Sequence, residues 1–353
     1  MNLIGRRALL AGVAAAAVAA GVAVVAAGQP DRSFTAGRPV GGSPAPADPP
    51  SVAPPPSSVV PSAAGPSSVV PSAPPGASTA ASLTGIRSWA YQLQDYPGGR
   101  LDELAAGPYQ LVVVDLARDA HSDFFTKAEI ARVRGTGKRA LAYFEIGSIE
   151  DFRPEYPELT RNAADLIANE WADWPGEYFV RYYDERWWRL VVQPRVDQAL
   201  KAGFDGVYLD TPLAYEEIDL DAVQGRDRTA LARAMAALIV RISRYAKSRR
   251  PGFLIVPQNS PELRHQADYT KAVDGIGMEH LFYLDSGERC AEDWCAENLA
   301  ETRALRDAGK FVLGVDYTTR SADIRAACNR YHAEKFAGTV TVLDLDRPVP
   351  PCP

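Results

Sequence analysis

Histidine, cysteine and methionine are scarce in this chain: its 353 residues include four histidines, four cysteines and three methionines. No two histidines stand at metal-ligand spacing and no Cys-x-x-Cys pair occurs, so nothing in the sequence indicates a zinc site. A glycine-rich phosphate-binding loop is missing after every predicted strand. We therefore expect no bound metal and no other cofactor.

Long apolar runs are also rare, because only the stretch from Ala8 to Ala27 is long enough to cross a membrane. It follows Arg6-Arg7 and ends in small residues, which is the anatomy of an export signal and resembles the twin-arginine type. We predict that residues 1–30 form a cleaved signal peptide, with an uncleaved signal anchor as the alternative. The protein is then secreted, or tethered at the outer face of the cytoplasmic membrane.

Charge is almost missing from residues 31–83, where Pro, Ala, Ser, Gly and Val dominate. The octamer Pro-Ser-Ser-Val-Val-Pro-Ser-Ala occurs at 56–63 and again at 66–73. Such a tract cannot bury a core, so we predict a disordered low-complexity linker. It serves either as a spacer or as a dispensable tether.

Basic residues are outnumbered by acidic ones, and the formal net charge is −6. An acidic protein has no electrostatic attraction for nucleic acid, so we expect no nucleic-acid partner. Residues 84–353 have a globular composition and the length of one eight-stranded α/β barrel. We expect this domain to act as a monomer on a polysaccharide.

All four cysteines lie late in the sequence. In an exported protein an even number favours two disulfides, which allows three pairings. We favour Cys290 with Cys295, which closes a short loop, and Cys328 with Cys352, which fixes the C-terminal tail.

Short apolar runs alternate with amphipathic stretches along the globular part. Helical patterns cover Lys127–Arg134, Trp187–Ala202, Ala230–Ser248 and Cys295–Ala308. Alternating strands and helices predict a parallel sheet, and eight such units predict an α/β fold closed into a (β/α)8 TIM barrel. An open doubly wound sheet is the alternative. The predicted strands are Ser88–Gln94, Leu111–Leu116, Arg139–Ile146, Gly206–Asp210, Phe253–Asn259, Gly275–Leu281, Phe311–Tyr317 and Thr339–Asp344.

Polar side chains recur at the last residues of these strands. The run Gly206–Asp210 is apolar until its end, and Asp210 shares a face with Tyr208 while Val207 and Leu209 point the other way. In a barrel all such ends surround one mouth, where active sites lie. Acids, amides and aromatics together favour a carbohydrate cleft. Besides Asp210 and Glu279, the candidates for substrate binding are Trp89, Tyr91, Asp115, Tyr143, Glu145, Tyr208, Gln258, Asn259 and Asp316.

Several of these segments, in this order, resemble one family, the endo-α-1,4-polygalactosaminidases of glycoside hydrolase family 114. The resemblance implies a TIM barrel, a retaining mechanism, and cleavage of α-1,4-linked galactosamine or N-acetylgalactosamine polymers. It also implies that Asp210 is the nucleophile and Glu279 the general acid/base. The motifs are Trp89-Ala-Tyr-Gln-Leu-Gln94, Val113-Val-Asp115, Ala142-Tyr-Phe-Glu-Ile-Gly-Ser-Ile-Glu-Asp-Phe-Arg153, Gly203-Phe-Asp-Gly-Val-Tyr-Leu-Asp210, Pro257-Gln-Asn259 and Gly275-Ile-Gly-Met-Glu279.

The chain departs from the family pattern after its third strand. Many relatives carry Tyr-Leu-Ser-Ile-Gly-Glu-Ala-Glu here, so Glu145 replaces a serine and Ser148 replaces a glutamate. We expect like charge from Asp210 and Glu279 to raise the pKa of Glu145. We assign Arg153 to ordering the following loop through a carboxylate, and Asp205 to a structural turn.

Two other functions fit the same residues. One is a non-catalytic carbohydrate-binding or wall-associated protein built on a hydrolase barrel, since fold does not fix function. The other is a hydrolase of a different α-linked hexosamine glycan.

Overall fold

The computed structural model describes residues 85–352 of the protein. The predicted export segment, residues 1–30, and the predicted linker, residues 31–83, lie outside the described residues. Among the helices of the described part, none combines the length and apolarity needed to cross a membrane.

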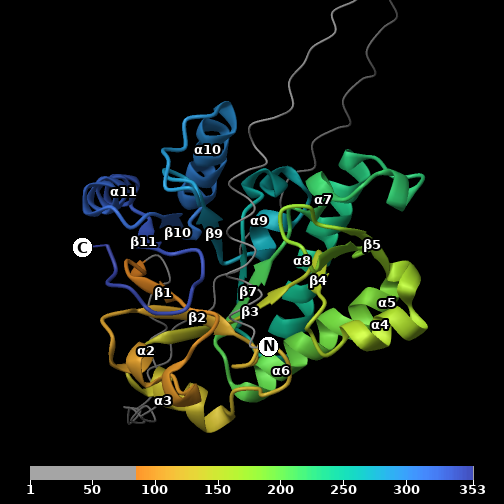
Figure 1. Cartoon of the computed structure of the whole chain (residues 1–353), viewed down its shortest axis with the longest axis horizontal. Coiled ribbons are helices and arrows are strands. Elements are labelled where there is room, and N and C mark those ends of the chain that lie inside the picture. Colours follow the sequence, from red (N-terminus) through yellow and green to blue (C-terminus); the bar gives the residue numbers. More distant parts are fainter. Residues whose placement is uncertain (1–84, 353) are drawn as a thin grey trace, which may run out of the picture. The chain divides into compact units, whose positions relative to one another are not determined.

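Parallel strands form the centre of the molecule (Figure 1). They pair in the orders β1-β2-β3-β7-β8 and β9-β10-β11. A parallel bridge between Gln258 and Gly277 continues the first sheet into the second, and the Asn259 amide donates to the Gly277 carbonyl at 2.8 Å. The strands are β1 (Trp89–Tyr91), β2 (Leu111–Asp115), β3 (Arg139–Glu145), β7 (Gly206–Asp210), β8 (Leu254–Pro257), β9 (Gly275–Glu279), β10 (Phe311–Tyr317) and β11 (Ala337–Thr341).

All eight predicted strands are present, and the α/β class with a parallel sheet is confirmed as a TIM-barrel-like fold. The first strand is shorter than predicted, since it ends at Tyr91, and the last begins at Ala337 and ends at Thr341. Polar residues at the ends of these two runs belong to loops, which apolar patterning alone does not separate from strands.

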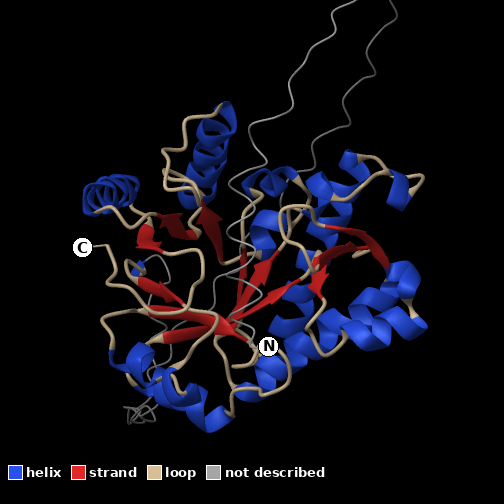
Figure 2. Cartoon of the chain, viewed as in Figure 1, coloured by secondary structure: helices blue, strands red, loops and turns tan. Residues whose placement is uncertain are grey.

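Helices cover the outer side of the strands (Figure 2). The four predicted helices are present, although the second is a composite: α5 and α6 are joined by a π-helical turn at Trp188–Val192. The helices are α2 (Asp102–Ala106), α3 (Lys127–Gly135), α4 (Tyr156–Asn162), α5 (Glu185–Trp187), α6 (Gln193–Ala202), α7 (Ala214–Glu217), α8 (Arg228–Arg249), α9 (Tyr269–Ala272), α10 (Asp293–Asp307) and α11 (Ser321–Glu334), with 3-10 turns at Pro97–Gly99, Ala164–Leu166, Asp221–Val223 and Pro261–His265.

Local sequence fixes several helix ends. Thr126 and Glu129 form a reciprocal capping box at the start of α3, which satisfies amides that have no partner within the helix. Gly203 ends α6 in the left-handed conformation at φ 85°, which a residue with a Cβ adopts only at a cost. These caps bring the chain back from each helix into the next strand.

Alternation along each strand divides the core into two layers. Tyr208 packs with Trp89 and Tyr143 on the inner side of the parallel strands, whereas Val207 and Leu209 pack outward against helices. The predicted facing of the Gly206–Asp210 strand is therefore correct. Because the period of a strand is two, a carboxylate two residues after Tyr208 must also face inward.

A small antiparallel sheet, which the apolar pattern of the sequence did not indicate, is inserted between β3 and α5. It consists of β4 (Ser148–Glu150), β6 (Glu177–Val180) and β5 (Ile167–Glu170), paired in that order. Its strands are only three or four residues long, too short to carry a clear apolar alternation. It begins only three residues after the end of β3, beside the predicted mouth of the barrel.

Both favoured cysteine pairings are confirmed, since Cys290 bonds to Cys295 and Cys328 to Cys352. The first disulfide links a loop to the start of α10, and the second links α11 to the C-terminal segment.

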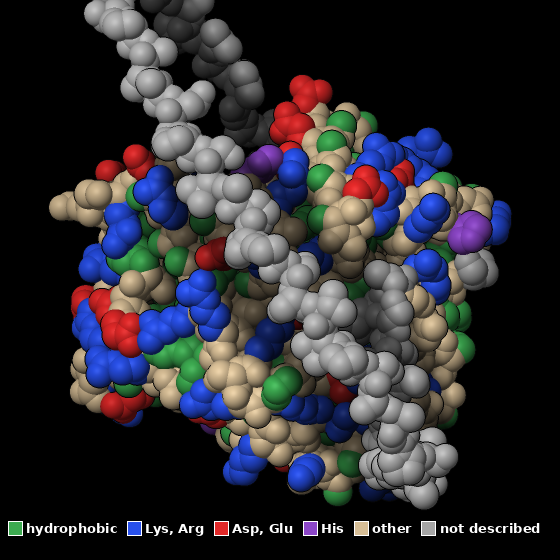
Figure 3. Space-filling view, turned by 180° about the vertical axis from the view of Figure 1, so that it is seen from behind, with side chains coloured by type: hydrophobic (Ala, Val, Ile, Leu, Met, Phe, Trp, Pro, Cys, Tyr) green, Lys and Arg blue, Asp and Glu red, His purple; other side chains and the backbone are tan. Residues whose placement is uncertain are grey.

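The exterior carries many charges of both signs. Figure 3 shows Lys and Arg side chains spread over one face with Asp and Glu among them. Many are exposed pairs, such as Arg186 with Asp165 and Arg241 with Glu185. Exposed pairs of this kind contribute roughly 0–1 kcal/mol each, so they indicate solubility more than stability.

Candidate active site

Two strands end in a carboxylate whose side chain points towards the mouth. Asp210 is the last residue of β7 and Glu279 the last of β9, with β8 between them. Each is partly accessible to solvent, unlike the buried residues that precede it in its strand. They are close enough to interact, because the charge of Glu279 helps to raise the pKa of Asp210.

Asp210 is held by two donors from different elements. The Thr211 amide donates to Oδ1 at 2.7 Å, and the Tyr143 hydroxyl donates to Oδ2. Burial, and then the charge of Glu279, raise the pKa of Asp210 to about 7, against the lowering effect of the Tyr143 hydrogen bond. This carboxyl group therefore exchanges its proton close to neutral pH.

Thr211 supplies its amide from an unusual backbone conformation. Its φ is 58°, in the left-handed region that β-branched residues rarely occupy. Its side-chain oxygen accepts from the Gly147 amide at 3.3 Å and lies 2.8 Å from the Ser148 hydroxyl, which also donates to Glu177 at 2.5 Å. The inserted antiparallel sheet thus fixes the turn that aims an N–H group at Asp210.

Glu279 is surrounded by amides and a tyrosine. Gln258 Nε2 and Asn259 Nδ2 donate to Oε2 at 2.6 and 3.0 Å, and the Tyr317 hydroxyl donates to Oε1. The Asn259 side-chain oxygen accepts from the Glu279 amide at 3.0 Å, which fixes the orientation of that amide group. Tyr91 in turn donates to Gln258 Oε1 at 2.9 Å.

An aromatic floor lies beneath the two carboxylates. The ring centroid of Tyr208 lies 5.3 Å from that of Tyr91, 6.2 Å from that of Trp89 and 6.5 Å from that of Tyr143. Trp89 and Tyr208 are fully buried, so they pack the interior and do not form an open sugar platform. A Cβ at position 277 would overlap the Tyr208 ring, so this position of the Gly-Ile-Gly motif requires glycine.

Asp115 and Glu145, two of the predicted substrate contacts, instead belong to a buried ion network. Arg153 contacts Asp115 at 3.0 Å, Glu145 at 2.6 Å and Glu150 at 2.8 Å, and Arg195 contacts Glu145 at 2.8 Å. Asp115 and Glu145 are both 0% exposed, so neither presents a carboxylate to a substrate.

The expected pKa shift of Glu145 is wrong in direction. Burial opposes ionisation of this carboxyl group, but the charges of Arg153 and Arg195 outweigh it and hold its pKa below the ordinary value. The prediction that Arg153 orders the loop through a carboxylate agrees with its contacts, although it engages three acids and not one. Arg195 comes from α6, about 50 residues away from Glu145, so no local motif indicated it.

Asp316 also differs from its predicted role in substrate binding. It points outward from β10, where its Oδ1 accepts from the amides of Phe282 and Tyr283 at 3.0 and 3.2 Å. Burial raises its pKa to about 6. Its neighbour in sequence, Tyr317, faces inward and contacts Glu279, and the sequence analysis did not select it for the site. Alternation along the strand from Leu313 and Val315 would have identified it.

Asp205 has the structural role that was expected. It is buried at the opposite end of β7, where it accepts from Arg134 at 3.0 Å and from the Ala140 amide at 3.0 Å. Within residues 85–352, no group of three or more His, Cys, Asp or Glu side chains is arranged to hold a metal ion.

A parallel α/β fold with two carboxylates at the carboxyl ends of its strands is an architecture that many glycoside hydrolases share. The chain belongs to glycoside-hydrolase family GH114, whose model matches residues 71–353. The resemblance drawn from the motifs is thereby confirmed. The protein is therefore a glycoside hydrolase.

Proteins of similar sequence occur in other organisms. A protein of Deinococcus radiodurans is 31% identical over 276 residues, which covers 78% of this chain and 85% of that protein. One of Thermotoga maritima is 32% identical over 251 residues, covering 70% of this chain and 75% of the relative.

Two solved structures share the fold. The glycoside hydrolase domain of PelA from Pseudomonas aeruginosa has a TM-score of 0.59 at 16% identity, covering 75% of this chain and 98% of that domain. Ega3 of Aspergillus fumigatus, solved in complex with galactosamine, has a TM-score of 0.57 at 17% identity, covering 77% and 98%.

Proposed function

We propose that the protein is an endo-acting hydrolase of α-1,4-linked galactosamine and N-acetylgalactosamine polymers that retains the anomeric configuration. Its membership of the family supports the reaction class, and the galactosamine complex of Ega3 supports the sugar. The observation that carries the proposal is the pair Asp210 and Glu279, each held by a tyrosine hydroxyl at the mouth.

In this mechanism Asp210 attacks the anomeric carbon while Glu279 protonates the departing glycosidic oxygen. The resulting glycosyl ester is then hydrolysed by a water molecule whose proton Glu279 accepts. The Thr211 amide and Tyr143 hydroxyl orient Asp210 and stabilise its charge, and the amides of Gln258 and Asn259 orient Glu279. The main-chain geometry of β7 and β9 sets the separation of the two groups.

We also propose that the strands close into a complete eight-stranded barrel. Support comes from contacts across the remaining gap: the Leu93 amide donates to the Leu345 carbonyl at 2.8 Å, and Trp89 Nε1 to the Gly314 carbonyl at 3.3 Å. Closure brings the ends of all the strands to one mouth.

We propose, third, that the protein acts outside the cytoplasm. Two disulfides fit an oxidising compartment, and the predicted export segment gives a route to it. The alternatives of a cleaved signal and a retained anchor are distinguished by N-terminal sequencing of the exported protein. We further propose that it acts as a monomer.

The function is tested with the chain in its oxidised form and a partly acetylated α-1,4-galactosamine polymer. We expect the parent protein to generate new reducing ends, and both Asp210→Asn and Glu279→Gln to lower that rate by about a thousandfold or more. Reducing-end release that survives in either variant would show that its carboxylate is misassigned.

Two further measurements distinguish the proposed function from its alternatives. Polymer that is retained by the parent protein but not cleaved supports a carbohydrate-binding protein. Cleavage of another α-linked hexosamine glycan at a higher kcat/KM would identify that glycan as the substrate. The anomer released first, followed by NMR, tests retention directly.

A further inference from the structure

A pocket of about 500 Å³ lies on the Glu279 side of the mouth, and neither Asp210 nor Glu279 is part of its lining. It lies where β10 and β11 end, and its lining includes Tyr317 and Thr341, which are paired neighbours in the two strands. Because Tyr317 also donates to Glu279, this one side chain connects the pocket to the proposed acid/base. The loop 285–288 forms a further part of the wall.

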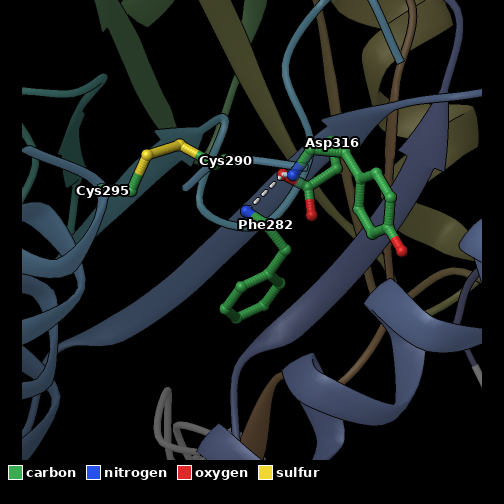
Figure 4. The surroundings of a disulfide bond; sticks show 5 residues. Phe282, Cys290, Cys295 and Asp316 are labelled. Atoms are coloured by element: carbon green, nitrogen blue, oxygen red, sulfur yellow. Dashed lines mark hydrogen bonds between the residues drawn. A yellow bond between two sulfur atoms is a disulfide. The ribbon is translucent and has the colours of Figure 1, made fainter. Parts of the chain in front are cut away.

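This wall is braced by interactions that do not involve the catalytic pair. Asp316 accepts the amides that open the loop, as Figure 4 shows for Phe282, and the Cys290 amide returns to the Phe282 carbonyl at 2.9 Å. The disulfide between Cys290 and Cys295 then ties the loop to α10 (Figure 4). The outward-facing Asp316 therefore shapes the pocket and leaves ligand contact to other residues.

The interior of the pocket contains an unused hydrogen-bonding group. Thr341 is 3% exposed, and its hydroxyl has no hydrogen-bond partner among the described residues. Leaving a buried hydroxyl without a partner is unfavourable, so such groups in native structures call for a ligand or water. In this position the hydroxyl can bond to a sugar hydroxyl placed beside Tyr317.

The charge at the rim is negative. Asp285 and Glu288 line the pocket, and within residues 85–352 neither has an ion pair with Lys or Arg. The arginine in the lining, Arg320, is already engaged, because it pairs with Asp323 at 2.5 Å and donates to the Gly287 carbonyl at 2.9 Å. The pocket consequently offers a ligand two carboxylates that have no ion pair, although Asp285 Oδ1 accepts from the Ser286 amide at 2.7 Å.

We infer that this pocket is a sugar subsite that distinguishes a free amine from an N-acetyl group. Asp285 and Glu288 bind the protonated amine of a hexosamine unit, and Thr341 bonds to a hydroxyl of the same ring. The inference rests on the proposed function, because it places this unit on the side of Glu279. It assigns the selection for deacetylated units to the loop 285–288 and not to the catalytic pair.

The test is a binding measurement in which no sugar is cleaved. All proteins carry Asp210→Asn, and the probes are a fully deacetylated α-1,4-galactosamine tetramer and its fully N-acetylated counterpart. We expect Asp285→Asn combined with Glu288→Gln to weaken binding of the deacetylated tetramer by about tenfold in calorimetry at low salt, since two exposed charge pairs are lost. Binding of the acetylated tetramer is expected to stay unchanged.

Two further variants complete the design. Glu297→Gln removes one negative charge from the exposed face of α10, outside the pocket, and is expected to change the affinity for neither tetramer. Thr341→Val keeps the side-chain shape and is expected to weaken the binding of both tetramers to the same extent. The inference would be overturned if the Asp285 and Glu288 double variant lost the same affinity for both tetramers, or lost affinity for neither.

Failure of this inference is distinguishable from failure of the proposed function. Release of reducing ends by the parent protein, with unchanged binding in the double variant, leaves the hydrolase intact and removes the subsite. Charge-selective binding without any release of reducing ends keeps the subsite and removes the hydrolase.

Discussion

Tyr143 and Tyr317 perform the same task for different carboxylates, since each donates its hydroxyl to one acid from an adjacent strand. Burial raises the pKa of both tyrosines, so they stay protonated and act as donors over the whole working range. At the scale of single residues, the chemistry of the site is set by these donors and by the interaction of the two acids.

Replacing Tyr143 tests the effect of its hydrogen bond on Asp210. Burial and Glu279 raise the pKa of Asp210 to about 7, while the Tyr143 hydroxyl lowers it. Tyr143→Phe should therefore move the acidic limb of the kcat/KM profile to higher pH and lower kcat/KM at pH 7 by about tenfold. Tyr182→Phe removes a buried hydroxyl that donates to the Leu231 carbonyl instead, and should leave the limb in place. A limb that does not move in Tyr143→Phe contradicts the assignment.

Asp210 should also lower the stability of the fold at neutral pH. Its pKa is about 7 in the folded protein against an ordinary value of 3.8, so the folded state binds the proton more tightly than the unfolded state. The resulting penalty is zero well below pH 4, grows as pH rises to about 7, and is constant above that. Asp210→Asn should raise the free energy of unfolding by a few kcal/mol at pH 8 and by much less at pH 4. Denaturant titrations at both values measure this, and an equal gain at both would disprove it.

At the scale of elements, the chain segment after β3 shapes one side of the mouth. Its inserted sheet holds Thr211 through Ser148, and its loop holds Arg153 in the buried ion network. The exchange of serine and glutamate relative to the family pattern fits this arrangement. Glu145 meets two arginines below the mouth, and the smaller Ser148 fits between Thr211 and Glu177.

Breaking the network should be much more costly than breaking an exposed pair. Arg153→Met leaves Asp115, Glu145 and Glu150 without their shared cation, and we expect a loss of about 3–5 kcal/mol in the free energy of unfolding. Arg161→Met removes an exposed pair with Glu158, so its expected loss is at most about 1 kcal/mol. Urea titrations of the two variants give the comparison, and similar losses would show that the network contributes little.

At the scale of the whole molecule, the two disulfides act on different parts of the last third of the chain. The Cys328–Cys352 bond spans 24 residues and holds the C-terminal segment against α11, whereas Cys290–Cys295 spans five. The longer loop constrains the unfolded chain more strongly.

Removing each pair should therefore have unequal effects. By loop length, replacing Cys328 and Cys352 with serine should cost about 3.5 kcal/mol, and replacing Cys290 and Cys295 about 2 kcal/mol. The second change should also weaken binding of the deacetylated tetramer, because it loosens the wall of the pocket. Thermal unfolding and calorimetry follow the two effects separately. Equal destabilisation with unchanged affinity would contradict both expectations.

Much of this structure is encoded locally and was predictable. The period of two along Gly206–Asp210 places Tyr208 and Asp210 on the inner face, and the apolar runs mark all eight strands. Both disulfides agree with the pairing that was favoured among the three possible ones. The alternation and the apolar runs depend on neighbours in sequence, so the sequence alone determined the α/β class, the inward direction of the acids and the ends of the strands on which they lie.

The tertiary structure decided which strand-end acids remain open to a substrate. Asp115 and Glu145 have the same position in their strands as Asp210, yet Arg153 and Arg195 neutralise them in the interior. Arg195 lies about 50 residues from Glu145, and such a contact depends on how a helix packs behind the sheet. Patterning fixes the direction of a side chain, but only packing determines whether a distant guanidinium or the solvent meets it.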